Sequence, residues 1–184
     1  SRPAFDSPSP RPATGSEILS LFLSQRPAPA VGSLVVPILL IVAVVGSGIA
    51  ASRLSTGDVG LQLLENAAAT ACALIGLILM FGAVSGAHFN PVVTLLDRML
   101  GTTTARDTVL YVLAQVVGGC LGTMLANVMF ELPVVELSTT DRSSAALWVS
   151  EVVATVTLLL VIQGCVRTGR ASVVPFAVGA WIGG

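Results

Sequence analysis

The stretch SGAHFNPVVTLLDRML, residues 85–100, holds the polar side chains that stand out most from an apolar background. His88 is the one histidine of the chain, and Asn90 and Pro91 follow it closely. An imidazole, a primary amide and backbone carbonyls recognise neutral polar molecules through hydrogen bonds. Catalysis would need paired carboxylates, a nucleophile with its base, or metal ligands, and none of these accompanies His88. The residue types therefore favour a passage or binding site, and we expect no enzyme.

The three cysteines show no spacing that indicates a metal site or a disulfide. Cys72, Cys120 and Cys165 each lie inside or at the end of an apolar run, without CxxC or Cys/His spacing. We interpret them as small apolar packing residues and expect no metal or other cofactor. The net charge of −1 offers no broad electrostatic field for a nucleic-acid partner.

The elements that must position residues 85–100 are predicted to be membrane spans. The sequence is 54% hydrophobic and only 10% charged, with a mean hydropathy of +0.90. Soluble domains carry about a quarter of charged residues. Crossing the hydrocarbon takes about 20 apolar residues. Uncharged runs cover 33–52, 66–96, 108–130 and 152–166. The last run reaches span length when it is extended back to Ala145, and this extension adds one charged residue, Glu151. These patterns predict an all-α, multi-pass membrane protein.

We place two regions on the sequence, a tail and a transmembrane domain. Residues 1–32 are rich in Pro and Ser, which predicts a disordered N-terminal tail. Within the tail, residues 16–27 form either a short interfacial helix or an unstructured continuation. The transmembrane domain covers 33–184, with spans at about 33–53, 64–84, 107–130 and 145–166, a re-entrant segment at 85–100 and the start of a fifth span at 173–184.

The arginines predict the orientation, because cytoplasmic loops of membrane proteins are enriched in Arg and Lys. With a cytoplasmic N-terminus, the inner segments hold seven of the nine basic residues. These are Arg2, Arg11, Arg26, Arg98, Arg106, Arg167 and Arg170. The outer loops then hold only Arg53 and Arg142. We therefore predict a multi-pass protein of the plasma or inner membrane in which residues 85–100 enter and leave on the cytoplasmic side.

A segment that enters and leaves on one side must turn back within the bilayer. Asn90 is a strong helix N-cap and Pro91 suits the first helical position. The ten residues 91–100 give about 15 Å of helix, roughly half of the hydrocarbon thickness of about 30 Å. We predict that 85–89 descends as irregular backbone and 91–100 returns as a half-helix, with Asn90 near the midplane. The alternative is a cytoplasmic loop with a short surface helix, for which the stretch is too apolar.

Irregular backbone at that depth is tolerated only where protein buries it or where it lines a hydrated cavity. Gly86 and Ala87 are small enough to bring the backbone close to a pore. The carbonyls of Gly86, Ala87 and His88 would form a ladder of acceptors, and the amide of Asn90 would donate. The half-helix directs the positive end of its dipole at the midplane. Such a site orients neutral molecules and repels cations and protons.

The motif GAHFNPVVT closely resembles the first asparagine-proline motif of the aquaporin (major intrinsic protein) family, SGAHxNPAVT, with Val92 in place of alanine. Gln115 in AQVVGGCLG resembles the glutamine of the family's third span, and Gly118 and Gly122 form a GxxxG pair that permits close helix packing. Glu151 opens EVVATVTLLL, which is similar to the ExxxTxxL signature at the start of each family repeat. We interpret Glu151 as a buried anchor for re-entrant backbone.

The resemblance implies an aquaporin-like right-handed bundle of two inverted repeats, each with three spans and one half-helix, assembled as homotetramers with one pore per subunit. It implies that His88 braces the half-helix. In the first repeat, the signature's glutamate and threonine positions fall on Ser33 and Pro37. The second asparagine-proline motif, its arginine and the sixth span are missing, so we expect a fragment. The alternative is a non-conducting membrane module that packs with partners through Gly118 and Gly122.

Position 70 bears on which solute passes. In the family, a second-span side chain about 20 positions before the asparagine lines the narrowest filter, and this count reaches Thr70. Strict water channels usually carry a bulky aromatic there. The small threonine predicts a wider filter that passes glycerol or neutral metalloid acids besides water. In the alternative interpretation, Thr70 is a packing residue whose hydroxyl binds its own helix backbone.

Few charges lie within the predicted spans. An ion channel or proton-coupled carrier would normally show several of them, and Glu151 is the candidate here. Asp97 and Arg98 end the half-helix on the cytoplasmic side, where Arg98 suits the negative end of the helix dipole. The alternative for Asp97 and Arg98 is a solvated pair.

Overall fold

The structure is a computed structural model that describes residues 32–139 and 143–184. The predicted tail, with the short helix expected at 16–27, lies outside the described residues apart from Gly32. The described part is helical and contains no strand. Its elements are α2 (Gly32–Leu54), α3 (Val59–Ser85), α4 (Pro91–Met99), α5 (Ala105–Met129), α6 (Ala145–Arg167), η1 (Ala171–Val173) and α7 (Val174–Gly183).

Four of these helices are long and apolar enough to cross a membrane, namely those within α2, α3, α5 and α6. The fold class predicted from the sequence, an all-α multi-pass membrane protein, is confirmed. Helix α3 begins at Val59 rather than near Leu64. The Asp58 side chain explains this early start, because it caps the helix by accepting a hydrogen bond from Leu61 N at 2.9 Å.

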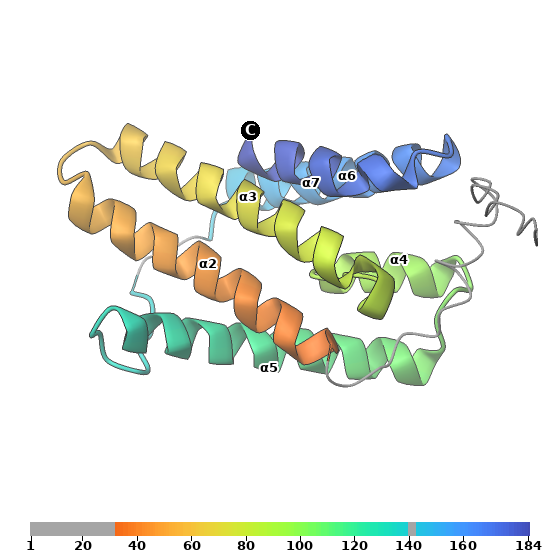
Figure 1. Cartoon of the computed structure of the whole chain (residues 1–184), viewed down its shortest axis with the longest axis horizontal. Helices are drawn as coiled ribbons and strands as arrows, with labels where there is room; N and C mark the ends of the chain where they lie inside the picture. The colour runs from red at the N-terminus through yellow and green to blue at the C-terminus, as the bar shows by residue number, and fades with distance from the viewer. Residues whose placement is uncertain (1–31, 140–142) are drawn as a thin grey trace, which may run out of the picture.

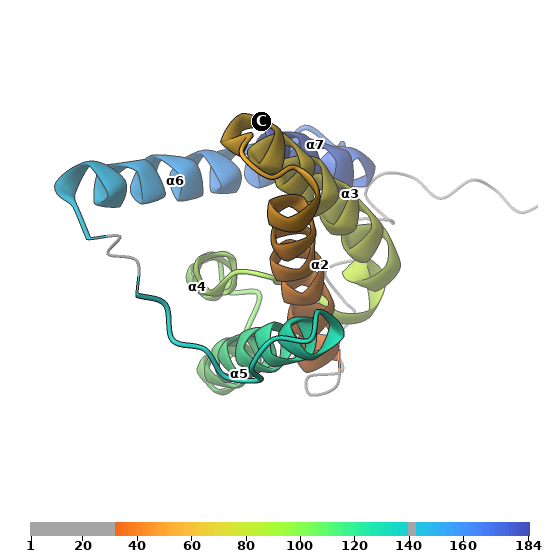
Figure 2. The same ribbon diagram turned by 90° about the vertical axis from the view of Figure 1, so that its left-hand side faces the viewer.

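Helix α2 packs closely along α5 (Figures 1 and 2). A Cβ added to Gly118 would lie 2.9 Å from the Leu34 carbonyl oxygen, and one added to Gly122 would lie 2.7 Å from that of Ile38. Side chains larger than hydrogen therefore cannot occupy these two positions without moving a helix. In lipid, packing between helices depends on such close approach, because the hydrocarbon is as apolar as the side chains. Pro37 sits in this interface, in the second turn of a helix that continues to Leu54.

Helices α3 and α7 form a second close contact of the same kind. A Cβ on Gly179 would lie 3.0 Å from the Ala71 carbonyl oxygen, and one on Gly183 would lie 2.8 Å from Ala71 Cβ. Gly179 and Gly183 are four residues apart and so share one face of α7. Small residues therefore hold together both α2–α5 and α3–α7.

Helix α6 is the least covered of the four long helices. Its described packing is mainly against α7, where Trp181 Nε1 donates to the Ala154 carbonyl oxygen at 3.2 Å. In the end view, α6 extends away from α2, α3 and α5 (Figure 2). Most of its other side chains are exposed.

The path between α3 and α5 turns back within the bundle. From the end of α3 the chain runs back alongside the long helices, and α4 then returns to the end of the molecule at which α5 begins (Figure 1). The nine residues of α4 give about 14 Å of helix at 1.5 Å per residue. The segment thus has the shape of a dip, with irregular backbone in one direction and a short helix in the other.

Candidate functional site

Residues 86–90, which we call the re-entrant loop, begin with a sharp turn. Gly86 has a φ of 71° and Ala87 a φ of 48°, both in the left-handed region. Gly86 N donates to the Gly82 carbonyl oxygen at 3.1 Å, which ends α3. A glycine adopts the left-handed conformation without strain, whereas an alanine adopts it at a cost of about 1–2 kcal/mol. The surrounding contacts must therefore hold Ala87 in place.

Asn90 ends the loop and caps α4. Its Oδ1 accepts a hydrogen bond from Val92 N at 2.8 Å, and Pro91 occupies the first turn, where a missing N–H costs nothing. The Asn90 amide NH₂ group donates to no group in the described part of the chain. Asn90 therefore presents a spare donor at the positive end of the α4 dipole.

Gln115 on α5 joins the loop to α4. Its Nε2 donates to the His88 carbonyl oxygen at 2.7 Å and to Thr94 Oγ1 at 3.0 Å. Gln115 and Thr94 are both buried. Because an unpaired donor or acceptor in this setting is costly, these bonds fix the loop and the half-helix to the same point on α5.

Tyr111 lies one turn before Gln115 and holds the entry to the loop. Its hydroxyl donates to the Ser85 carbonyl oxygen at 3.2 Å, and both residues are buried. The Tyr111 ring also packs against the imidazole of His88, with centroids 5.4 Å apart. Tyr111 and Gln115 therefore anchor backbone carbonyls at both ends of the turn.

The imidazole of His88 is held from α4 itself. Its Nε2 lies 2.8 Å from Oδ2 of Asp97, and the two side chains are 10% and 27% exposed. Asp97 was expected to form either a helix-ending pair with Arg98 or a solvated pair. The structure instead joins Asp97 to His88, while Arg98 is exposed one position further on.

The three carbonyls of the expected ladder differ in their hydrogen bonds. The carbonyl oxygens of Gly86 and Ala87 accept no hydrogen bond from the described part of the chain, whereas that of His88 accepts from Gln115. A carbonyl oxygen has two lone pairs, so the His88 oxygen keeps one acceptor position. Two free acceptors and one shared acceptor thus precede the spare donor of Asn90.

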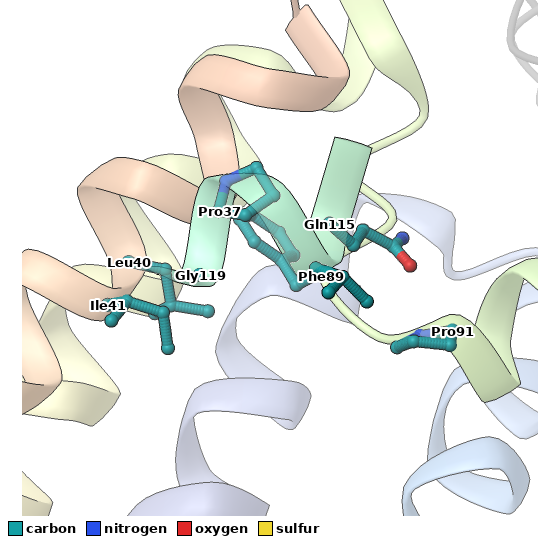
Figure 3. Close-up of a pocket in the computed structure, with 8 residues that line it drawn as sticks. Pro37, Leu40, Ile41, Phe89, Pro91, Gln115 and Gly119 are labelled. Carbon is teal, nitrogen blue, oxygen red and sulfur yellow. The ribbon is translucent and has the colours of Figure 1, made fainter. Parts of the chain in front are cut away.

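An apolar pocket of about 130 Å³ lies beside the loop, between α2 and α5 (Figure 3). Figure 3 shows Phe89 and Pro91 facing it opposite Pro37 and Ile41. Gln115 supplies the one polar side chain in the lining, and its Nε2 is already engaged. The pocket therefore offers no row of hydrogen-bonding groups, and we assign the chemistry to the loop.

Thr70 and Glu151 make no hydrogen bond to the re-entrant loop within the described residues. Thr70 is half-buried on α3, and its Oγ1 is buried without a hydrogen-bond partner among the described residues. The alternative bond to its own helix backbone is therefore not formed. Glu151 was predicted to be a buried anchor, yet it is exposed on α6. The physical reason is that α6 packs mainly on α7, so no described element covers this carboxylate.

The burial of the three cysteines and of Ser33, a signature position of the first repeat, is also defined in the structure. Cys72 and Cys120 are exposed and Cys165 is half-buried, so the first two do not pack inside the described bundle. Ser33, at the signature's glutamate position, is buried.

Thr94 and Tyr111 are site residues that were not predicted from the sequence. A signal for them exists in the spacing. Thr94 and Asp97 are three apart on α4, and Tyr111 and Gln115 are four apart on α5, so each pair shares one helix face. Polar residues that repeat on one face of an apolar helix point to the protein interior.

Comparisons with known proteins identify the family of the chain. Residues 26–183 match the family model described as major intrinsic protein. The chain belongs to the major intrinsic protein family, as the resemblance of its asparagine-proline motif indicated.

Several curated relatives align with the chain. It is 45% identical over 144 residues to "Aquaglyceroporin AqpS" of Rhizobium meliloti (strain 1021), covering 78% of this chain and 61% of that protein. It is 35% identical over 109 residues to "Probable aquaporin NIP4-2" of Arabidopsis thaliana, covering 55% and 38% respectively. It is 39% identical over 57 residues to "Probable aquaporin AqpM" of Archaeoglobus fulgidus, covering 31% and 23%. The chain thus spans less than two thirds of the length of these relatives.

Proposed function

We propose that the intact protein is a passive transmembrane channel for water and small uncharged solutes. The observation that carries the proposal is the re-entrant loop, which ends in the Asn90 cap of α4. Free carbonyls at Gly86 and Ala87, followed by the amide NH₂ of Asn90, suit molecules that both donate and accept hydrogen bonds. Family membership supports the same function.

The same geometry favours neutral solutes over ions. The N-terminus of a helix carries about half a positive charge, and here it points into the bundle at Pro91. Cations and protons that approach this end are repelled, and an anion that passes the loop meets the negative ends of the free Gly86 and Ala87 carbonyls. Transport by such a site needs no cofactor and no covalent step.

The solute class follows from Thr70 and from the relatives. A half-buried threonine at the filter candidate position leaves more room than an aromatic ring. One relative is called an aquaglyceroporin, and we extend that class to this chain. The intact channel then passes glycerol or neutral metalloid acids, arsenite among them, as well as water.

We further propose a homotetramer in the plasma or inner membrane, with the N-terminus in the cytoplasm. The arginine distribution supports this orientation. Exposed apolar side chains on α5 and α6, such as Leu113 and Val153, suit contact with lipid or with a second subunit.

The non-conducting module remains the alternative function. In that interpretation, partners would pack against Gly118 and Gly122. These glycines are already in close contact with Leu34 and Ile38 of α2, so their face is occupied within the chain. This observation favours the channel.

Stopped-flow light scattering of proteoliposomes tests the proposal. With the full-length protein, we expect rapid volume changes in glycerol gradients and in water, and no dissipation of a proton gradient. The variant Thr70→Phe narrows the filter and should reduce glycerol flux more than water flux. Ala69→Ser, a change at the neighbouring position on α3, serves as the matched control. Permeation of water alone, unchanged by Thr70→Phe, would contradict the proposed solute class, and no flux above empty liposomes would contradict the channel.

A further inference from the structure

The pairing of His88 with Asp97 is a contact that the motif alone does not contain. Asp97 lies on α4 almost two turns beyond the Asn90 cap. His88 lies in the loop before that cap, so the 2.8 Å contact between Nε2 and Oδ2 closes the loop onto its own half-helix. The contact is local to residues 88–97 and needs no other element.

The other nitrogen of His88 indicates which hydrogen bond is made. Nδ1 is buried and has no partner among the described residues. A carboxylate only accepts, so Nε2 must be the donor in this pair. A proton on Nδ1 would be a buried N–H without an acceptor, which is unfavourable. The neutral tautomer with hydrogen on Nε2 makes the hydrogen bond to Asp97 and leaves Nδ1 as an acceptor without a partner among the described residues.

We propose that Asp97 is a positioning residue that fixes His88 in the Nε2–H tautomer and so clamps the re-entrant loop onto α4. Tyr111 and Gln115 restrain the loop through its backbone from α5. Asp97 restrains it through a side chain from α4, and therefore opposes a different motion, the lifting of the loop away from the half-helix.

The clamp has a structural consequence for the turn. A Cβ on Gly86 would lie 3.3 Å from His88 Nε2, so the clamped ring lies directly over the left-handed turn of Gly86 and Ala87. When the ring is released, this cover is lost. The free carbonyls of Gly86 and Ala87 are then no longer held in one direction. The clamp would thus orient carbonyls that line the proposed channel. Its permeability test rests on the proposed function.

His88 is the one histidine within residues 1–184, which makes the clamp measurable by NMR. The full-length protein is labelled with ¹⁵N-histidine, purified on a tag without histidine and reconstituted in nanodiscs. The spectrum of a His88→Gln variant identifies which signals belong to His88. We expect a protonated Nε2 and an unprotonated Nδ1 for the unaltered protein. In Asp97→Ala, the signals should move towards those of a tautomer mixture. Asp97→Asn keeps an acceptor oxygen and should keep the Nε2–H signal, and Arg98→Ala is the matched control.

Permeability supplies the second measurement. We expect Asp97→Ala to lower glycerol flux by about tenfold, the scale expected for losing one hydrogen bond to a charged group. Asp97→Asn should retain most of the flux, and Arg98→Ala should retain all of it. Flux retained in Asp97→Asn but lost in Asp97→Ala would show that position 97 needs a side chain with an acceptor oxygen.

Three results would overturn the clamp: a proton on Nδ1 in the unaltered protein, unchanged histidine signals in Asp97→Ala, or an Asp97→Asn variant that behaves like Asp97→Ala. The first needs no substitution at Asp97, so it decides the question even where Asp97→Ala does not fold. If the signals change as expected while even the unaltered protein conducts nothing, the clamp stands and the proposed channel fails.

Discussion

Helices α5 and α6 have 25 and 23 residues, and each is apolar enough to cross a bilayer. Their burial differs. Helix α5 buries a stripe of small and polar side chains against α2 and α4: Thr108, Tyr111, Gln115, Gly118, Gly122, Ala126 and Asn127. Helix α6 buries Leu158 alone among its residues, and its carboxylate at Glu151 is exposed.

The two helices show that hydropathy identifies a span but does not say which face packs. In hydrocarbon an apolar side chain gains little by leaving lipid for protein, so close approach and hydrogen bonds decide the contact. Helix α5 supplies both, through Gly118 and Gly122 on one part of its stripe and through Tyr111 and Gln115 on the other. Substitutions matched between the two helices can break or sharpen this contrast.

The largest effect is expected from Gly122→Val. The new side chain meets the Ile38 carbonyl oxygen and Ile41 Cβ, and backbone cannot give way as a flexible side chain does. We expect a loss of about 3 kcal/mol in the free energy of unfolding, at the upper end of overpacking costs. Reversible unfolding in mixed micelles, followed by circular dichroism, measures it. Gly164→Val on α6 is the control, because a Cβ there meets nothing within 4 Å; equal losses would contradict the contrast.

Gln115→Leu should come next. It removes the donor of two hydrogen bonds and leaves the His88 carbonyl oxygen and Thr94 Oγ1 without it. We expect a loss of about 1–3 kcal/mol in unfolding free energy, together with reduced glycerol flux. Gln163→Leu on α6 is the control, since Gln163 is half-buried and makes no hydrogen bond within the described part of the chain. A more damaging Gln163→Leu would show that α6 has a polar contact of its own.

Asn90→Ala tests the two helix caps against each other. Asn90 caps α4 inside the bundle, and Ser144 caps α6 by accepting from Leu147 N at 3.3 Å. Each alanine variant should cost about 1 kcal/mol of stability. Flux in proteoliposomes should fall only for Asn90→Ala, because only this variant also removes a donor from the proposed path. A similar fall for Ser144→Ala would mean that flux follows stability alone.

The smallest effect is expected from Glu151→Gln in the 184-residue chain. The side chain is exposed, and exposed substitutions usually change unfolding free energy by no more than about 0.5 kcal/mol. The same micelle experiment measures it, with Glu136→Gln, an exposed loop residue, as the control. A loss well above that of the control would mean that another element covers this face of α6, and would restore Glu151 as an anchor.

The sequence predicted the fold class and the family because both depend on strong local signals. Uncharged runs of span length indicate membrane helices, and the asparagine-proline motif is specific. The Asn90 cap could also be anticipated, since an N-cap followed by proline is a short-range pattern. These features involve neighbours in sequence.

The remaining contacts depend on how helices rotate against each other, which spacing alone does not determine. Tyr111 reaches Ser85 across 26 positions, and Gln115 reaches His88 across 27. Asp97 was expected to close the half-helix together with Arg98, or to form a solvated pair with it, yet its carboxylate lies 2.8 Å from His88 Nε2. Glu151 was expected to be buried, but a family signature indicates the role of a residue and does not say which element covers it.

The geometry at Gln115 makes this position selective for an amide. The His88 oxygen is a carbonyl and can only accept, so the group that faces it must carry hydrogen. Glutamate has nearly the same shape and volume as glutamine, yet as a carboxylate it would place two acceptors face to face. At position 115 the chain therefore discriminates between side chains by the presence of a proton rather than by size.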